Sequence, residues 1–172
     1  MCYTITSRKG VIMEQYEEKI KLVLFDINNE QHLSFYKELR KDESIFKWFQ
    51  GLLPNLLRKT DDIFNKGFLL SYNNELIGYM DISNYIIEEE AIYIRGAIEK
   101  EHRGKSLGKK MLKDITEYIF NNYMYIRFIK SKINKNNIAS IKMATNAGFK
   151  NIYSDYYIIE NPFYDKRKNK QL

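Results

Sequence analysis

The sequence predicts one α/β (α+β) domain in which a mixed, mostly antiparallel central sheet carries helices on both faces. Two observations lead to this fold class. Strands joined by short turns fill residues 67–100 and favour antiparallel pairing, whereas a helix–strand–helix–strand succession over 106–161 favours parallel pairing. The 172 residues suit one domain, and no Pro-, Gly- or Ser-rich linker divides them. We therefore expect a single domain over 1–172, with residues 1–17 and 163–172 peripheral.

The first third of the chain predicts a strand followed by helices. Residues 19–27 (KIKLVLFDI) have the apolar, β-branched character of a strand. Residues 29–41 predict a helix because their apolar positions recur every three residues. A second helical region extends over about 43–60, and Pro54 is expected to divide it because proline cannot continue a helix ladder.

The middle of the chain predicts a hairpin and a further strand. Residues 67–72 and 75–86 flank the pair Asn73–Asn74, and asparagine tolerates the positive φ of a tight turn. The next strand is expected over 91–100. Gly96 lies inside this strand, where it indicates either a bulge or a close approach of backbone.

From residue 106 the apolar period changes from two to 3.6, which predicts a helix over about 106–122. Its expected core positions are Leu107, Met111, Ile115, Tyr118 and Ile119. A strand over 124–133 and a short helix over 136–149 follow. Residues 149–161 supply one long strand or two short ones, and the basic tail 164–172 is expected to fray.

Charge and composition restrict the partners. The net charge of +6 favours anionic partners without choosing among nucleic acid, membrane and polyphosphate. The single cysteine, Cys2, allows no intrachain disulfide, and we expect no metal. The N-terminus lacks the apolar segment of a signal peptide, and the longest apolar stretch, 45–57, is too short and polar to span a bilayer. We expect a cytoplasmic protein with no membrane partner.

Residues 99–112 (EKEHRGKSLGKKML) predict an anion site at the start of a helix. A helix N-terminus presents unpaired N–H groups and a partial positive charge, and small residues let a phosphate approach the backbone. Gly104 and Gly108 are only four residues apart, which excludes the Gly-x-x-x-x-Gly-Lys-Ser/Thr loop. The Gly-x-Gly-x-x-Gly dinucleotide loop is also absent.

Two segments resemble motifs of the GNAT superfamily of N-acetyltransferases, and together they cover roughly residues 65–160. The first resembles motif A, with Arg103 in its first position, Gly108 in its last and Ser106 where the family usually has its middle glycine. The second resembles motif B, in which Asn137 opens a helix that ends at Gly148–Phe149. The resemblance implies a GNAT-like fold with strands splayed at the cofactor site.

The resemblance also implies acetyl-CoA as co-substrate, with its pyrophosphate on the motif A loop and its pantetheine arm near the motif B helix. The positions that it implies for binding are Ala97, Ile98, Lys100, Arg103, Gly104, Lys105, Ser106, Leu107, Gly108, Lys109, Asn137 and Ser140. The Ser106 hydroxyl is expected either to cap the helix or to touch a phosphate.

The implied reaction is transfer of an acetyl group to a primary amine of a small molecule, a polyamine or a protein N-terminus. An amine with a pKa of about 10 must lose a proton before it attacks. We expect Glu90 to be the catalytic carboxylate, because it lies nearest the central strand among three consecutive glutamates. The alternatives are Glu88, Glu89, Glu99, Glu101 and His102.

The general acid is not identified by the sequence. Many family members have a tyrosine seven residues after the motif B asparagine, and this chain has Ala144 there. This departure resembles the ribosomal-protein and polyamine acetyltransferase branch. Tyr153, Tyr156 and Tyr157 are either core residues or the lining of an acceptor pocket, and the apolar segment 45–57 either covers the acceptor cleft or forms a dimer surface.

Two other functions are left open. A protein that binds acetyl-CoA without significant catalysis is consistent with Ser106 and Ala144. Nonspecific nucleic-acid binding is consistent with the basic tail, but no helix-turn-helix or RNP-like motif accompanies it. We expect no specific nucleic-acid partner, and a monomer or a homodimer.

Overall fold

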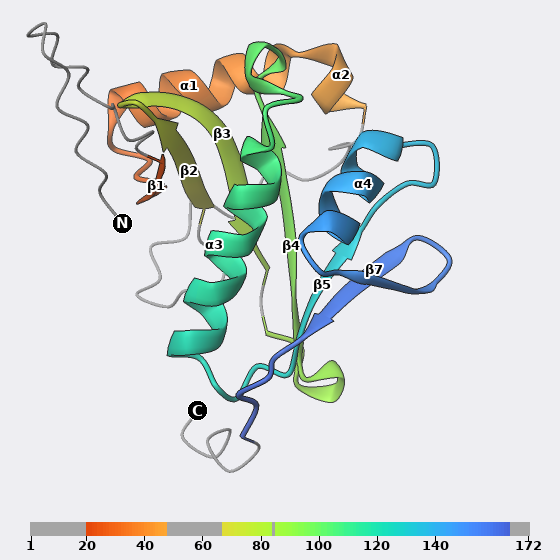
Figure 1. The fold of residues 1–172 in the computed structure, drawn as a ribbon. Helices are drawn as coiled ribbons and strands as arrows, with labels where there is room; N and C mark the ends of the chain where they lie inside the picture. Colours follow the sequence, from red (N-terminus) through yellow and green to blue (C-terminus); the bar gives the residue numbers. More distant parts are fainter. Residues whose placement is uncertain (1–19, 48–66, 84, 166–172) are drawn as a thin grey trace, which may run out of the picture.

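The computed structural model describes residues 20–47, 67–83 and 85–165, and these form one seven-stranded sheet with helices on both faces (Figure 1). The strands are β1 Ile20–Leu24, β2 Gly67–Tyr72, β3 Glu75–Ile82, β4 Ala91–Ile98, β5 Phe128–Lys132, β6 Lys150–Tyr153 and β7 Tyr156–Glu160. The helices are α1 Glu30–Lys41, α2 Glu43–Phe46, α3 Leu107–Asn122 and α4 Ile138–Asn146, with 3₁₀ turns η1 Ile87–Glu89 and η2 Lys100–His102. The strand order is β1-β2-β3-β4-β5-β7-β6. All neighbouring strands are antiparallel except β4 and β5, so the predicted fold class is confirmed.

Most predicted elements are confirmed, with changes at their ends. Asn73 and Asn74 form the hairpin turn with φ of 50° and 68°, as their residue type predicts. The strand predicted over 75–86 ends at Ile82, and the strand predicted over 124–133 begins only at Phe128. The last strand region is two strands, β6 and β7. The predicted helical region 43–60 is described only as far as 47, and Pro54 and the tail beyond 165 lie outside the described residues.

Gly96 marks a close approach of backbone, because the register between β3 and β4 is regular through this position. A Cβ atom built on Gly96 would lie 2.7 Å from the Tyr79 carbonyl oxygen. A bulge does occur between β2 and β3, where Leu70 pairs with Gly78 and Ser71 with Leu76, which leaves Ile77 of β3 as the extra residue, and no sequence pattern predicted it.

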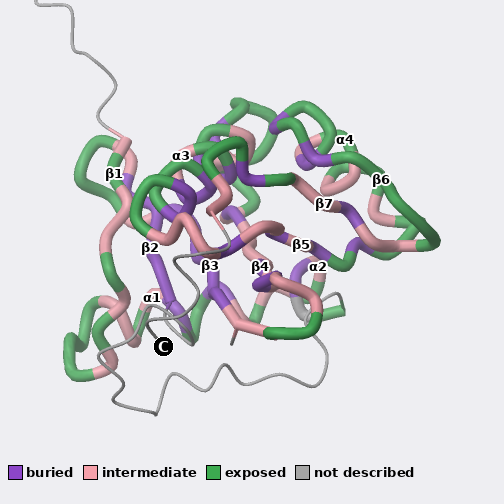
Figure 2. Tube along the Cα trace, turned by 90° about the horizontal axis from the view of Figure 1, so that it is seen from below, coloured by how far each residue is buried: buried purple, intermediate pink, exposed green. Residues whose placement is uncertain are grey.

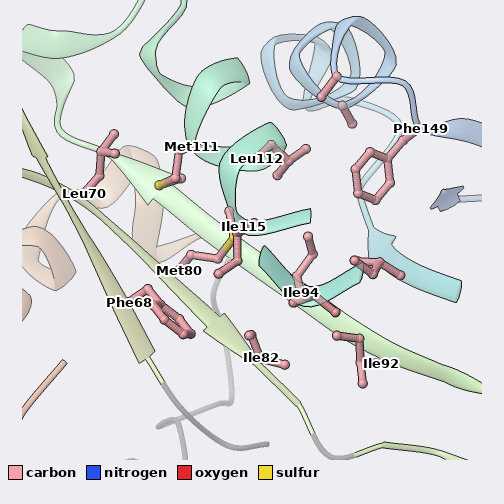
Figure 3. Close-up of a cluster of buried hydrophobic side chains, with 14 of the residues drawn as sticks. Phe68, Leu70, Met80, Ile82, Ile92, Ile94, Met111, Leu112, Ile115 and Phe149 are labelled. Carbon is pink, nitrogen blue, oxygen red and sulfur yellow. The ribbon is translucent and has the colours of Figure 1, made fainter. Parts of the chain in front are cut away.

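The main core lies between the sheet and α3. Ile92 and Ile94 of β4 pack with Met111 and Ile115 of α3, and each is almost completely buried (Figure 3). Burying one such side chain stabilises a fold by about 1.5–3 kcal/mol. Four of the five predicted core positions of α3 are buried. Tyr118, the exception, is 43% exposed and lies edge-on to the Phe68 ring.

A second, smaller core lies on the other face of the sheet, beneath α1. Tyr36 and Leu39 of α1 pack on Leu69 of β2 and Tyr79 of β3. The buried residues of the sheet are concentrated in central strands such as β2 and β3. The edge strand β6 is exposed along its whole length (Figure 2).

The sheet opens between β4 and β5. These strands pair over three residue pairs only, and the last pair is Tyr93 with Lys130. β4 continues to Ile98 along β3, so its second half has no pairing with β5 and the two strands diverge (Figure 1). This is the splay that the sequence resemblance implies.

Candidate functional site

The loop between β4 and α3 presents a row of unused backbone donors. The N–H groups of residues 104–109 make no hydrogen bond to a described residue, and the helix ladder begins with Lys110 N–H donating to Ser106 O at 3.1 Å. Gly104 and Ser106 have φ of 79° and 60°. Left-handed residues placed between right-handed or extended ones turn successive N–H groups toward one side, which forms an anion-binding concavity.

Ser106 occupies the N-cap position of α3 without capping it. Its side chain accepts no hydrogen bond from the first turn of the helix, so the predicted helix cap is wrong. The left-handed backbone explains this result, because a side-chain cap requires an extended N-cap residue. The free N–H groups of the first turn therefore stay available to a ligand.

The lysines around the loop differ in their availability. Lys110 forms an ion pair with Asp114 at 3.0 Å on the same helix. Lys105 and Lys109 form no ion pair within the described ranges, and Lys105 is exposed. These two ammonium groups can therefore add positive charge beside the free N–H row.

Arg103 is held by its own chain. Its Nε donates to the Ile98 carbonyl oxygen, Nη1 to Ser44 Oγ and Nη2 to Asp42 Oδ2, each at 2.8 Å. The loop is thereby tied both to the end of β4 and to the junction of α1 and α2. Lys100 contributes a carbonyl oxygen that accepts from Arg103 N–H at 3.3 Å.

Gly108 brings α4 alongside the loop. A Cβ atom on Gly108 would lie 2.6 Å from Met143 Sδ of α4 and 3.5 Å from Ile98 Cγ1. The last glycine of the motif therefore lies at a close contact between α3 and α4. Leu107 beside it is buried in the main core, which anchors the first turn of α3.

The hydrogen bonds at both ends of β4 decide which of its backbone groups face the opening. The Tyr93 carbonyl oxygen accepts from Ser83 N–H at 2.8 Å, and Glu99 N–H donates to the Ile77 carbonyl oxygen at 2.9 Å. Polar groups of an antiparallel strand alternate between its two sides. The backbone N–H and C=O groups of the odd-numbered residues of β4 therefore face β3. Those of the even-numbered residues face the other side, where β5 pairs with the first half of β4 and the opening borders the second half.

Gly96 and Ile98 are thus the residues whose N–H groups line the opening, because the pairing of Tyr93 with Lys130 engages the Ile94 N–H with β5. The Ile98 carbonyl oxygen is already bonded to Arg103. Ala97 is the register partner of Tyr79, so its N–H and C=O are directed to β3. The sequence missed Gly96 because only the observed register distinguishes the two sides of the strand.

Helix α4 carries the motif B residues. Asn137 Oδ1 accepts from Ser140 N–H at 3.2 Å and caps the helix, as its position predicts. The Asn137 amide nitrogen makes no hydrogen bond within the described part of the chain. Ala144 is 1% exposed in the core between α3 and α4, so this position offers no proton donor.

The face opposite α3 carries a compact polar group at the foot of the opening. Glu89 Oε2 accepts from the Tyr93 hydroxyl at 2.9 Å and from Lys130 Nζ at 2.6 Å. These hydrogen bonds, chiefly the one from Lys130, lower the pKa of the Glu89 carboxyl. Tyr93 and Lys130 are the last paired residues of β4 and β5, so this group lies where the two strands begin to diverge.

A buried ion pair lies on the same face. Asp81 of β3 is the register partner of Arg95 of β4, and its carboxylate accepts from Arg95 Nε and Nη2 at 2.7–2.9 Å. Burial raises the pKa of the Asp81 carboxyl, against the effect of the guanidinium. Arg95 is two residues beyond Tyr93, so the pair borders the opening.

Glu90, the expected catalytic carboxylate, lies like Glu89 just before β4, at the end remote from the loop, but its carboxylate has other partners. Its carboxylate accepts from the Tyr164 hydroxyl at 2.7 Å and from Arg127 Nη1 at 3.4 Å. Its φ of 49° directs the chain into β4. The structure thus brings Glu89, and not Glu90, to the foot of the opening.

The remaining candidates lie elsewhere. Glu99 and His102 are 3.6 Å apart at the top of β4, and burial raises the pKa of the Glu99 carboxyl. Tyr157 is a core residue, whereas Tyr153 is 60% exposed and stacks on Tyr156 with ring centroids 5.0 Å apart. The core interpretation is thus confirmed for Tyr157, and the lining of an acceptor pocket by Tyr153 and Tyr156 stays a prediction.

The described residues contain neither a candidate membrane-spanning helix nor a candidate metal-binding cluster. No described helix is both long enough and apolar enough to cross a membrane. Over 20–47, 67–83 and 85–165, no three or more His, Cys, Asp and Glu side chains gather in a way that could hold a metal ion.

Solved structures with this fold include several acetyltransferases. An aminoglycoside acetyltransferase AAC(6')-Ib in complex with coenzyme A has a TM-score of 0.68 and 20% identity, covering 84% of this chain and 96% of that one. A spermidine N-acetyltransferase from Vibrio cholerae, in complex with CoA and spermine, has a TM-score of 0.67 and 15% identity, with coverages of 84% and 97%. A domain from Methanocaldococcus jannaschii has a TM-score of 0.67 and 18% identity, with coverages of 84% and 99%. At these identities the likeness establishes the fold alone.

Membership of a family is established by comparison of the sequence with family models. A search of curated protein sequences found no significant match. A sequence model described as "Acetyltransferase (GNAT) family" matches residues 22–149, well over half of the chain and the segment that holds both motifs, the loop and the opening. The chain therefore belongs to the GNAT family of acetyltransferases.

Proposed function

We propose that this chain is an acetyl-CoA-dependent N-acetyltransferase that acts on a primary amine of a small molecule, a polyamine or a protein N-terminus. One observation carries the proposal. The free N–H groups of 104–109 begin beside Ile98, where the unpaired edge of β4 also begins and extends to Tyr93. An anion site followed by a strip of strand-like donors and acceptors fits a pyrophosphate followed by an arm with amide groups.

Each part of this track has a role in the proposal. The N–H groups of 104–109, with Lys105 and Lys109, would bind the pyrophosphate. The Gly96 carbonyl oxygen and the Ile98 N–H would hold the arm, with Asn137 and Ser140 on its α4 side. Acetyl-CoA supplies an acetyl group already activated as a thioester.

Gly96 is the proposed electrophile-stabilising residue. Its N–H is the free donor nearest the foot of the opening, because the last pairing of β4 with β5, Tyr93 with Lys130, engages the Ile94 N–H. A preorganised backbone N–H aimed at the carbonyl oxygen would stabilise the negative charge that develops as the amine attacks. Loss of one such donor typically costs a factor of about 10²–10³ in kcat.

The acceptor would approach from the α1 face. Glu89 is the carboxylate at the foot of the opening on that face, and we propose it, in place of Glu90, as the group that binds the acceptor ammonium and receives its proton. The ammonium would replace one of the two donors that Glu89 now binds. Spermine and kanamycin, which occur in complexes of similar structures, are amines of this kind.

A protein that binds acetyl-CoA without catalysis is the second candidate. The observation in its favour is Ala144, a buried methyl group at the position where a phenol would serve as general acid. An unassisted thiolate with a pKa of about 8.5 is nevertheless an adequate leaving group.

Calorimetry and a turnover assay test both candidates. Titration with acetyl-CoA should show one site per chain, and thiol release should follow with at least one amine from a panel of polyamines, aminoglycosides and peptides. Binding without turnover on any of them favours the second candidate. The absence of binding at high micromolar acetyl-CoA would contradict both.

The choice of carboxylate has its own test. Glu89→Gln should lower kcat by about 10²-fold, the ordinary contribution of a positioned base, with little change in the Kd of acetyl-CoA. Glu90→Gln is the matched change one residue away, at the contacts with Tyr164 and Arg127. A larger loss of kcat for Glu90→Gln than for Glu89→Gln would restore the sequence-based assignment.

A further inference from the structure

The Arg103 side chain connects two parts of the chain that are remote in sequence. Its Nη1 and Nη2 reach Ser44 Oγ and Asp42 Oδ2, 59 and 61 residues away, at 2.8 Å. Its Nε reaches the Ile98 carbonyl oxygen, also at 2.8 Å. All three nitrogens of the guanidinium thus have an acceptor from the protein, and one of these is an ionised partner.

Asp42 is held in a fixed orientation. Its Oδ1 accepts from Ser44 N–H at 2.8 Å and from the Ser44 hydroxyl, which leaves Oδ2 for Arg103. The hydrogen bond from the Ser44 hydroxyl is the main reason that the pKa of the Asp42 carboxyl is below its usual value. The carboxylate is therefore an ionised, preoriented partner, which favours one geometry of the loop.

Arg103 is part of the segment with the free donors. It immediately precedes Gly104, and the N–H groups of 104–109 follow it directly. Three of the five guanidinium N–H groups are bound to Ile98, Ser44 and Asp42, and the positive charge is already paired with the Asp42 carboxylate, so the guanidinium would have to give up this pairing to become a full charge partner of a phosphate. Anchoring of the guanidinium, by contrast, holds the start of the N–H row against the end of β4.

We propose that Arg103 is a positioning residue that, anchored by Asp42 and Ser44, holds the N–H row of 104–109 in the geometry that binds the pyrophosphate, and is not itself a phosphate ligand. This inference rests on the proposed function. It assigns a supporting role in anion binding to an acidic residue, Asp42, that no motif includes.

The direction in which Asp42→Asn changes the affinity for an anionic ligand distinguishes the anchoring role from a direct effect of the charge. Asp42→Asn removes a negative charge near an anion site, so Coulomb's law alone predicts tighter binding of an anionic ligand. Loss of the anchor predicts weaker binding. Asparagine caps helices as well as aspartate does, so the start of α2 is preserved.

Calorimetric titration with coenzyme A provides the measurement, because it reports binding without turnover. We expect Asp42→Asn to raise Kd about tenfold, whereas Glu101→Gln, the removal of an exposed acid in the same loop, should leave Kd unchanged or lower it. Arg103→Lys, which keeps the charge and loses the fork, should raise Kd by a similar factor. The Asp42→Asn/Arg103→Lys double variant should bind no more weakly than either single variant.

The salt dependence of binding gives an independent readout that a general loss of stability would not change. Arg103→Gln should raise Kd while the slope of log Kd against log salt stays that of the wild type, and Lys105→Gln should reduce that slope. Tighter binding by Asp42→Asn, additive effects in the double variant, or a reduced slope for Arg103→Gln would each overturn the inference. Failure of the wild-type chain to bind coenzyme A would contradict the proposed function instead.

Discussion

Ser106 combines a side chain with a backbone conformation that favours glycine. Its φ of 60° lies in the left-handed region, where an L-residue costs roughly 1–2 kcal/mol. The sequence showed that serine stands where the family usually has glycine, and the structure shows that the glycine-like backbone is kept. The hydroxyl does not offset this strain, because it does not cap α3.

Ser106→Gly should therefore stabilise the free protein. We expect a gain of about 0.5–1 kcal/mol in the free energy of unfolding, since relief of left-handed strain exceeds the added entropy of glycine. Urea denaturation measures it, and Ser106→Ala, which keeps Cβ and removes only the hydroxyl, is the control. Tighter binding of acetyl-CoA by Ser106→Gly would mean that Cβ obstructs the loop, and weaker binding by both variants would make the hydroxyl a phosphate ligand.

At the scale of elements, the sequence predicted what depends on local chemistry. The Asn73–Asn74 turn, the start of α4 at Asn137 and the amphipathic face of α3 follow from residues close together in the chain. The anchor of Arg103 could not be predicted, because its partners lie about 60 residues away. The choice of Glu89 over Glu90 depends on the left-handed turn at Glu90, which no local pattern announced.

Two glycines of the site should respond differently to alanine. A Cβ on Gly96 would meet the Tyr79 carbonyl oxygen at 2.7 Å, and one on Gly108 would meet Met143 Sδ at 2.6 Å. Backbone of a central strand cannot move aside, whereas a methionine side chain can. We expect Gly96→Ala to cost at least about 2 kcal/mol and Gly108→Ala about 1 kcal/mol or less.

Urea denaturation of both variants checks this order. A Gly108→Ala/Met143→Ala cycle should show coupling, because shortening Met143 removes the contact that the new methyl group would make. Equal costs for the two alanine variants, or an uncoupled cycle, would contradict the assignment of Gly108 to helix packing.

At the scale of the whole molecule, two half-sheets meet at a short seam. β1–β4 and β5–β7 share three register pairs, and the Glu89–Lys130 ion pair, at 2.6 Å, crosses the same junction. The resemblance implied this splay, but its position at Tyr93 follows only from the tertiary pairing. The fold class and the anion-binding loop between β4 and α3 could thus be predicted from the sequence. The carboxylate proposed to face the acceptor could not.

The ion pair predicts a pH dependence of stability. The pKa of Glu89 is lowered in the folded protein, so its contribution is present above its unfolded pKa of about 4.5 and is lost as the pH falls through the folded value. Glu89→Gln should therefore flatten the decline of the free energy of unfolding between about pH 5 and pH 3. Glu88→Gln, at an exposed neighbour, is the control, and an equal flattening by both would contradict the prediction.

The second half of β4 also bears on the stability and self-association of the ligand-free protein. An uncovered strand edge inside a sheet is a template for any extended peptide, including another copy of the same chain. A ligand that lines this edge competes with such association and adds to stability by mass action, by about 2.7 kcal/mol at a hundredfold excess over Kd. We therefore expect the ligand-free form to be both the less stable form and the one more prone to associate with itself.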